Sequence, residues 1–217
     1  MNDTYLKRIV DSQINEYLES VGSLLIEGPK WCGKTRTAEE HSKSSIHIVS
    51  KNQIESLRLA AESGSVAFLE GETPKLIDEW QDVPEIWNVI RFEVDRRREN
   101  GQFILTGSSV PPEDPLRHSG AGRIARISMR TMSLFESGDS NGSVSLESML
   151  ESETIDGYAD TKIEQLADVI LRGGWPLVVS DDRFRSDKVV RDYLKSVVMS
   201  NLSRVDGVQK ILPLQQK

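Results

Sequence analysis

The chain has 217 residues, of which 37% are hydrophobic and 28% are charged, so it can form one domain or a domain with a small appendage. Its formal net charge of -7 argues against a general nucleic-acid coat, because neutralising phosphates requires clustered Lys and Arg. Cys32 is the only cysteine, which excludes an intrachain disulfide, and no apolar run approaches the roughly 20 residues of a membrane span. Since the N-terminus also lacks a signal-peptide pattern, we expect a cytoplasmic protein with no membrane partner.

The first half of the chain predicts alternating helices and strands. Apolar residues at helical spacing indicate an amphipathic helix over residues 5–18. Strands and helices then alternate, beginning with a strand, over residues 24–26, 34–42, 46–49, 52–62, 75–79, 84–99 and 103–106. This order implies a parallel sheet with helices on both faces.

The pattern changes after residue 110. Residues 123–129 alternate apolar and polar side chains and predict a last strand, whereas residues 131–160 contain seven acids and no Lys or Arg. The Ser- and Gly-rich part at 137–145 should be an exposed, mobile loop. Helices are predicted over 161–171 and 184–205. The apolar stripe of the first of these helices should pack on the core, although a partner-binding face is the alternative. That stripe consists of Ile163, Leu166, Ile170 and Leu171.

One segment carries a specific chemical pattern. Residues 28–35 read Gly-Pro-Lys-Trp-Cys-Gly-Lys-Thr and match the phosphate-binding loop G-x-x-x-x-G-K-[ST] at every fixed position, between a predicted strand and a predicted helix. The glycines let successive backbone N–H groups point at phosphate oxygens, and the helix that follows presents its N-terminus to the same anion. Lys34 would reach the β- and γ-phosphates, and Thr35 would place its hydroxyl on Mg²⁺.

The predicted nucleotide-binding residues run without a gap along this segment. They are Gly28, Pro29, Lys30, Trp31, Cys32, Gly33, Lys34, Thr35 and Arg36. Cys32 could be redox-sensitive in such an electropositive loop, but a small filler at a variable position is the simpler interpretation.

Acids and hydroxyls end the later strands. Asp78 follows an apolar run and can hold Mg²⁺, and Glu79 is placed to polarise an attacking water as a general base. Because the carboxyl ends of parallel strands converge on a ligand crevice, Thr106 or Ser108 could sense the γ-phosphate or orient the water. Solvated acids and helix-capping hydroxyls are the plain alternatives.

The arginines divide into two groups. Arg123, Arg126 and Arg130 lie at the predicted last strand, where Arg123 could reach a neighbouring subunit's nucleotide and stabilise transition-state charge; a solvated strand surface is the alternative. Residues 96–98 are three arginines at a helix end, which suits a solvated helix terminus better than a nucleic-acid patch.

The ordered series of motifs resembles a known group. The series is residues 28–35, Leu-Ile-Asp-Glu-Trp-Gln at 76–81, Phe-Ile-Leu-Thr-Gly-Ser-Ser at 103–109, Ala-Gly-Arg at 121–123, Met-Ser-Leu-Phe-Glu at 132–136 and Gly-Gly-Trp-Pro at 173–176. It resembles prokaryotic AAA-superfamily ATPases that carry a C-terminal domain of unknown function. The resemblance implies that Lys34, Thr35, Asp78 and Glu79 keep the roles argued above. It places Thr106 or Ser108 at the sensor position and matches Arg123 to the family's Gly-Arg.

The predicted fold is therefore α/β, with a three-layer parallel-sheet P-loop NTPase core of AAA type followed by a small helical subdomain. Residues 1–130 form the core with its N-terminal helix, residues 131–160 an acidic linker region, and residues 161–217 the helical subdomain, which we expect to be truncated because members of the group usually continue further.

The predicted function is ATP hydrolysis with Mg²⁺ that drives conformational change in a partner or an attached domain. The alternative is an ATP-dependent regulatory switch with negligible hydrolysis, and a small-molecule kinase is a third reading. No Asn-Lys-x-Asp base-reading motif of GTPases is found in the sequence, which favours ATP. The resemblance also suggests a homo-oligomer and a macromolecular partner, with nucleic acid left open.

Overall fold

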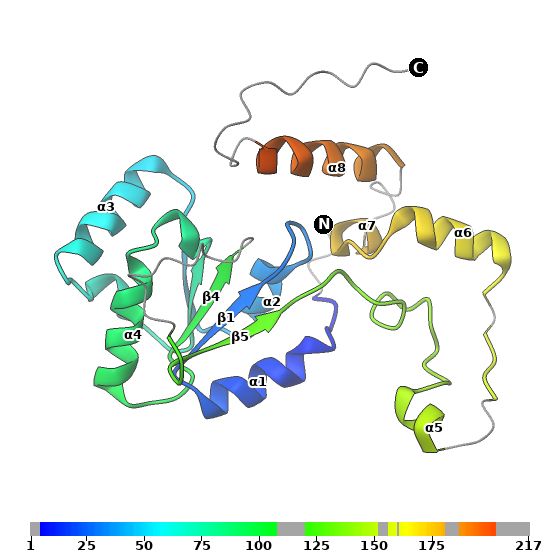
Figure 1. The fold of residues 1–217 in the computed structure, drawn as a ribbon, viewed down its shortest axis with the longest axis horizontal. Helices are drawn as coiled ribbons and strands as arrows, with labels where there is room; N and C mark the ends of the chain where they lie inside the picture. The colour runs from blue at the N-terminus through cyan, green and yellow to red at the C-terminus, as the bar shows by residue number, and fades with distance from the viewer. Residues whose placement is uncertain (1–4, 108–119, 152–155, 160, 181–186, 203–217) are drawn as a thin grey trace.

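A five-stranded parallel sheet forms the centre of the molecule (Figure 1), with strands in the order β2-β3-β4-β1-β5. This computed structural model describes residues 5–107, 120–151, 156–159, 161–180 and 187–202. The strands are β1 (Ser23–Glu27), β2 (Ser44–His47), β3 (Lys75–Asp78), β4 (Phe103–Gly107) and β5 (Ile124–Ser128). The predicted parallel α/β sheet is confirmed.

Helices cover both faces of this sheet. They are α1 (Val10–Ser20), α2 (Lys34–Glu40), α3 (Lys51–Glu62) and α4 (Ile86–Arg97). Side chains alternate along β1, so that Leu25 belongs to the apolar cluster formed with α3 and α4, whereas Leu24 and Ile26 belong to the cluster formed with α1 and α2. The predicted three-layer architecture is therefore confirmed.

Some boundaries differ from the prediction. The first helix begins at Val10 rather than at residue 5, because the Ile9 amide donates to Glu136 Oε1 at 2.8 Å and the Arg8 amide to Asp11 Oδ2 at 2.8 Å. These two amides are satisfied by carboxylates instead of an additional helical turn. Strand β2 ends at His47 rather than at residue 49, where its pairing with β3 ends.

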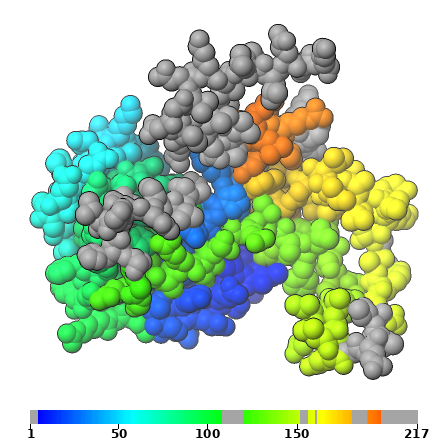
Figure 2. All heavy atoms as spheres, in the orientation of Figure 1, coloured from blue at the N-terminus to red at the C-terminus, as the bar shows by residue number. Residues whose placement is uncertain are grey.

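The C-terminal part of the described chain is helical. Its helices are α5 (Leu146–Glu151), α6 (Ile163–Arg172), α7 (Pro176–Ser180) and α8 (Asp187–Leu202). Helix α5 lies inside the predicted linker and was not expected, and neither was the short α7. The segment around α5 stands clear of the sheet (Figure 1, Figure 2). None of the helices that the structure describes is long and apolar enough to cross a membrane.

The apolar stripe of α6 is not buried, so the prediction that it packs on the core is wrong. Ile163 is 79% exposed and Ile170 72% exposed, and Leu166 and Leu171 are also exposed. The C-terminal region contacts the core instead through Trp175, which packs against the apolar cluster of α1 and α2, and through Tyr193 on α8, which is 5% exposed and donates to the Lys30 carbonyl. An amphipathic pattern identifies an apolar face but not what covers it.

Candidate nucleotide-binding site

The loop between β1 and α2 has the backbone that its glycines predict. Gly28 has φ 156° and Gly33 has φ 100°, a region of backbone conformation that L-residues with side chains rarely adopt. A Cβ on Gly28 would lie 2.1 Å from the Met129 carbonyl oxygen. Gly28 therefore allows the loop to pass directly against the end of β5.

The Lys34 side chain is drawn into the loop. It is 6% exposed, and its Nζ donates to the carbonyl oxygens of Gly28 at 3.0 Å and of Pro29 at 2.9 Å. The ammonium group is thus held at the mouth of the loop by two backbone acceptors. Anionic oxygens are stronger acceptors for such a donor than carbonyl oxygens.

Asp78 joins the loop to two strand ends. Its Oδ1 accepts from the Thr35 hydroxyl at 2.9 Å and from the Thr106 hydroxyl, and its Oδ2 lies 3.3 Å from His47 Nδ1. The parallel registers bring these groups together, since Asp78 pairs with Thr106 across β3 and β4 and with His47 across β2 and β3. A carboxylate beside a loop hydroxyl is the donor set that Mg²⁺ takes in phosphate sites.

Glu79 follows Asp78 in a left-handed conformation, with φ 57°. Its amide donates to Thr106 Oγ1 at 3.4 Å, and its carboxylate accepts from the Gln81 side-chain amide. Glu79 therefore lies at the carboxyl edge of the sheet beside the hydroxyl that contacts Asp78. This is the location that the sequence predicts for a general base.

The middle of the loop faces the C-terminal helices. Trp31 is 50% exposed and its ring centroid lies 5.1 Å from that of Tyr193 on α8, whose hydroxyl donates to the Lys30 carbonyl at 2.9 Å. Tyr193 also packs on Trp175, with centroids 4.3 Å apart. Cys32 is fully buried, and burial raises the pKa of its thiol despite the opposing charges of Lys34 and Arg8, which favours the filler interpretation.

Other predicted residues lie away from this cluster. Arg123 precedes β5 at the opposite, amino edge of the sheet and contacts Asp95, with Nε 2.8 Å from Oδ1. The structure does not bring it to the loop of its own chain, so its predicted role is limited to a neighbouring subunit's nucleotide, with a solvated surface arginine as the alternative. Arg36, on the exposed side of α2, lies 5.6 Å over the Tyr5 ring. Ser108 lies outside the described residues.

Sequence reasoning missed several residues at the site. His47 ends β2, so the rule that finds Asp78 and Thr106 at strand ends would also have found it. Gln81 lies two residues after Glu79 and has no comparable signal. Arg8 and Glu136 are more distant along the sequence, yet Arg8 Nη1 donates to the Cys32 carbonyl at 2.8 Å and Arg8 Nε pairs with Glu136 Oε1 at 2.9 Å.

This chain is similar to several solved structures and curated proteins. A STAND signal-transduction ATPase with a tetratricopeptide-repeat sensor from Pyrococcus horikoshii is 16% identical with TM-score 0.47, covering 90% of this chain and 32% of that one. AMPPCP-bound DnaA from Aquifex aeolicus is 14% identical with TM-score 0.43, covering 91% of this chain and 61% of that one. Uncharacterized proteins of Mycobacterium tuberculosis and Mycobacterium bovis are each 27% identical over 137 residues. The match covers 62% of this chain and 31% of theirs, so the chain spans about a third of their length.

A family model described as an AAA domain matches residues 21–137. The matched region begins just before β1, contains all five strands, and includes the loop with Lys34 and the strand ends with Asp78 and Thr106. It extends past Glu136 to Ser137, and so covers more than half of the sequence. The chain therefore belongs to the AAA domain family.

Proposed function

We propose that this chain binds Mg·ATP at the loop between β1 and α2 and hydrolyses it, to drive conformational change in a partner or an attached domain. The observation that carries the proposal is the joint contact of Thr35 and Thr106 with one carboxylate oxygen of Asp78, beside a glycine loop that holds the buried Lys34 ammonium. Membership of the AAA domain family supports it.

The residues fit a phosphate chain and its metal ion. Gly28 leaves space for a loop that a Cβ would obstruct, and the Lys34 amine can exchange its two carbonyl acceptors for phosphate oxygens. Thr35 and Asp78 would hold Mg²⁺ between them, the hydroxyl directly and the carboxylate directly or through water. Magnesium bound there supplies charge neutralisation at the phosphate oxygens.

Glu79 is the proposed general base. Its carboxylate would orient an attacking water and accept a proton from that water. The Thr106 hydroxyl oxygen accepts a hydrogen bond from the Glu79 amide and so holds the Glu79 backbone next to Asp78. The proton acceptor and the metal-holding carboxylate are adjacent in sequence, and the left-handed backbone of Glu79 turns the chain between them. The Thr106 hydroxyl would serve as the polar sensor.

A regulatory switch with negligible hydrolysis is the second candidate, and one contact favours it. The Glu79 carboxylate accepts from the Gln81 amide, so that the proposed base is engaged within its own chain. In this case nucleotide binding, rather than turnover, would act on the C-terminal helices through the contact of Tyr193 with the loop.

The test compares Mg·ATP binding and phosphate release for wild type, Lys34→Ala and Glu79→Gln. Lys34→Ala should abolish detectable binding, because the loop loses the ammonium group that the Gly28 and Pro29 carbonyls hold and that would bind the phosphates. Glu79→Gln should retain binding but lower turnover by about a hundredfold or more, the usual contribution of a general base.

Each outcome decides between the candidates. Binding without phosphate release in wild type would support the switch and reject the hydrolase. Release that is equal in wild type and Glu79→Gln would reject Glu79 as the base. Absence of Mg·ATP binding in wild type would overturn both candidates.

A further inference from the structure

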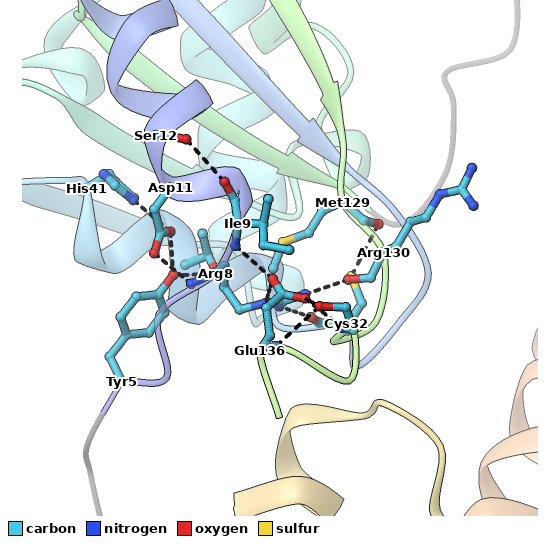
Figure 3. Close-up of polar contacts among 12 residues, drawn as sticks. Tyr5, Arg8, Ile9, Asp11, Ser12, Cys32, His41, Met129, Arg130 and Glu136 are labelled. Atoms are coloured by element: carbon cyan, nitrogen blue, oxygen red, sulfur yellow. Dashed lines mark hydrogen bonds and ion pairs between the residues drawn. The ribbon is translucent and has the colours of Figure 1, made fainter. Parts of the chain in front are cut away.

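Arg8, which lies outside the nucleotide-binding motif, donates a hydrogen bond to the backbone of the phosphate loop. Arg8 precedes α1 and is 7% exposed, and its guanidinium contacts two segments that are distant from it in sequence, the phosphate loop and residues 130–136 (Figure 3). It donates through Nε to Glu136 at 2.9 Å, through Nη1 to the Cys32 carbonyl at 2.8 Å and through Nη2 to the Arg130 carbonyl at 2.8 Å. The side chain of Arg130 points away from this cluster in Figure 3, so only its backbone takes part.

The contact with Cys32 fixes one peptide plane of the loop. In a trans peptide the carbonyl of one residue and the N–H of the next point in opposite directions. Because Arg8 holds the Cys32 carbonyl, it also sets the direction of the Gly33 N–H, away from the guanidinium. Arg8 Nη1 lies 3.2 Å from the position that a Cβ on Gly33 would occupy, so the arginine packs directly on this residue.

Glu136 holds the arginine in this orientation. Its side chain is 8% exposed, and it accepts from the Ile9 amide at 2.8 Å and the Ser133 amide at 2.7 Å as well as from Arg8. Burial alone would raise the pKa of Glu136, but these donors outweigh it and hold the pKa below its ordinary value. The carboxylate therefore stays ionised and balances the buried guanidinium.

We infer that Arg8 is a positioning residue for the phosphate loop, holding the Cys32–Gly33 peptide in the orientation that binds phosphate, with Glu136 fixing the arginine. The inference rests on the proposed function for its ligand. Its geometric part is that Arg8 holds the loop in the conformation that buries Cys32, and this part can be tested without any nucleotide.

The test uses Arg8→Lys, which keeps the charge but can donate to fewer of the three acceptors. Glu93→Gln is the matched control, because Glu93 also takes part in a buried pair with arginines (Arg96 and Arg97), but on α4, away from the loop. Both variants should lose thermal stability. Measurements are made well below the unfolding transitions of all the proteins.

Two readouts separate positioning from general stability. The first is alkylation of Cys32 by iodoacetamide, which reports loop opening in a chain with this single cysteine. Arg8→Lys should react about tenfold faster than wild type, since a charge-assisted hydrogen bond is lost, and Glu93→Gln should react at the wild-type rate. The second readout is affinity: Arg8→Lys should bind Mg·ATP and Mg·ADP about tenfold more weakly, with AMP affinity unchanged.

The results distinguish failure of the positioning role of Arg8 from failure of the proposed function. Faster alkylation in Arg8→Lys without any nucleotide binding by wild type would reject the proposed function and keep the loop-positioning role. Wild-type alkylation and affinity in a folded Arg8→Lys would overturn the inference. If Arg8→Lys does not fold, Glu136→Gln takes its place, with faster alkylation and a few-fold loss of Mg·ATP affinity expected, and wild-type values again overturning the inference.

Discussion

At the scale of single residues, the site depends on one carboxylate that receives groups from several strands. Asp78 Oδ1 accepts both threonine hydroxyls, and Oδ2 faces His47. These groups come from β2, β4 and the start of α2, so their meeting point is defined by the parallel registers rather than by neighbouring sequence. A shift of one residue in the β3–β4 register would separate Asp78 from Thr106.

Acid should weaken the contribution of Glu136 to stability. Because its folded pKa lies below the ordinary value, this carboxylate stabilises the native state fully above that value, and the stabilisation is lost as the pH falls through the folded pKa. The difference in free energy of unfolding between wild type and Glu136→Gln should therefore be largest above about pH 5 and shrink in more acidic solution. Denaturant titrations across this pH range measure it.

Glu147→Gln provides the control, since Glu147 is an exposed carboxyl on α5. It should follow the wild-type pH dependence throughout. A difference between wild type and Glu136→Gln that stays constant with pH would contradict an ionised, hydrogen-bonded Glu136.

The residues that sequence reasoning identifies and those it misses differ for a physical reason. The positions of Lys34, Asp78 and Thr106 follow from local patterns, a glycine loop or a polar residue after an apolar strand, and the parallel sheet brings them together. The role of Arg8 depends on a partner 128 residues further along the chain, which no local pattern specifies. Within the sequence, Arg8 looks like any other charged residue on the polar side of an amphipathic pattern.

At the scale of elements, the strands and helices of the core were predictable because each buries a short apolar run or stripe. The alternation of Leu24, Leu25 and Ile26 between two apolar clusters requires helices on both faces. The same reasoning fails for α6, whose stripe is as well formed as those of the core helices but lies exposed. Helix α5 has only six residues, and its apolar side chains at helical spacing, Leu146, Met149 and Leu150, are exposed, so the pattern is too short to identify a helix.

Substitutions in two helices should therefore have different costs. Ile170→Gln on α6, where the side chain is 72% exposed, should change the free energy of unfolding by less than about 0.5 kcal/mol. Ile90→Ala on α4, where the side chain is fully buried, should cost about 2–5 kcal/mol through lost burial and a cavity. Urea denaturation of both variants tests this contrast, and equal costs would mean that α6 is buried in solution.

At the scale of the whole molecule, the C-terminal helices return to the phosphate loop while the segment between them and the sheet stands apart. Tyr193 contacts the Lys30 carbonyl across 163 residues of sequence, whereas residues 140–150 are exposed throughout. The exposure of most of the predicted loop at 137–145 is confirmed, and its mobility stays a prediction. The division into core, linker region and helical subdomain also stays a proposal.

Limited proteolysis tests that division. Residues 131–151 contain no Lys or Arg, so a glutamate-specific protease rather than trypsin probes them. Cleavage should occur first after Glu147 and Glu151, which are exposed, and later after Glu136, which is buried against Arg8. Mass spectrometry of early fragments identifies the sites, and early cleavage after Glu136 would contradict its burial.

The sheet order also determines when the phosphate loop can form during synthesis. Strand β1 leaves the ribosome early, but its two neighbours are residues 103–107 and 124–128. Until translation passes β4, the apolar strand before the loop has no partner on either side, and until translation passes β5 one side stays unpaired and Gly28 has no Met129 to pack against. The nascent chain therefore carries an incompletely paired hydrophobic strand until β5 has been made, a state in which chaperone binding and aggregation compete with folding.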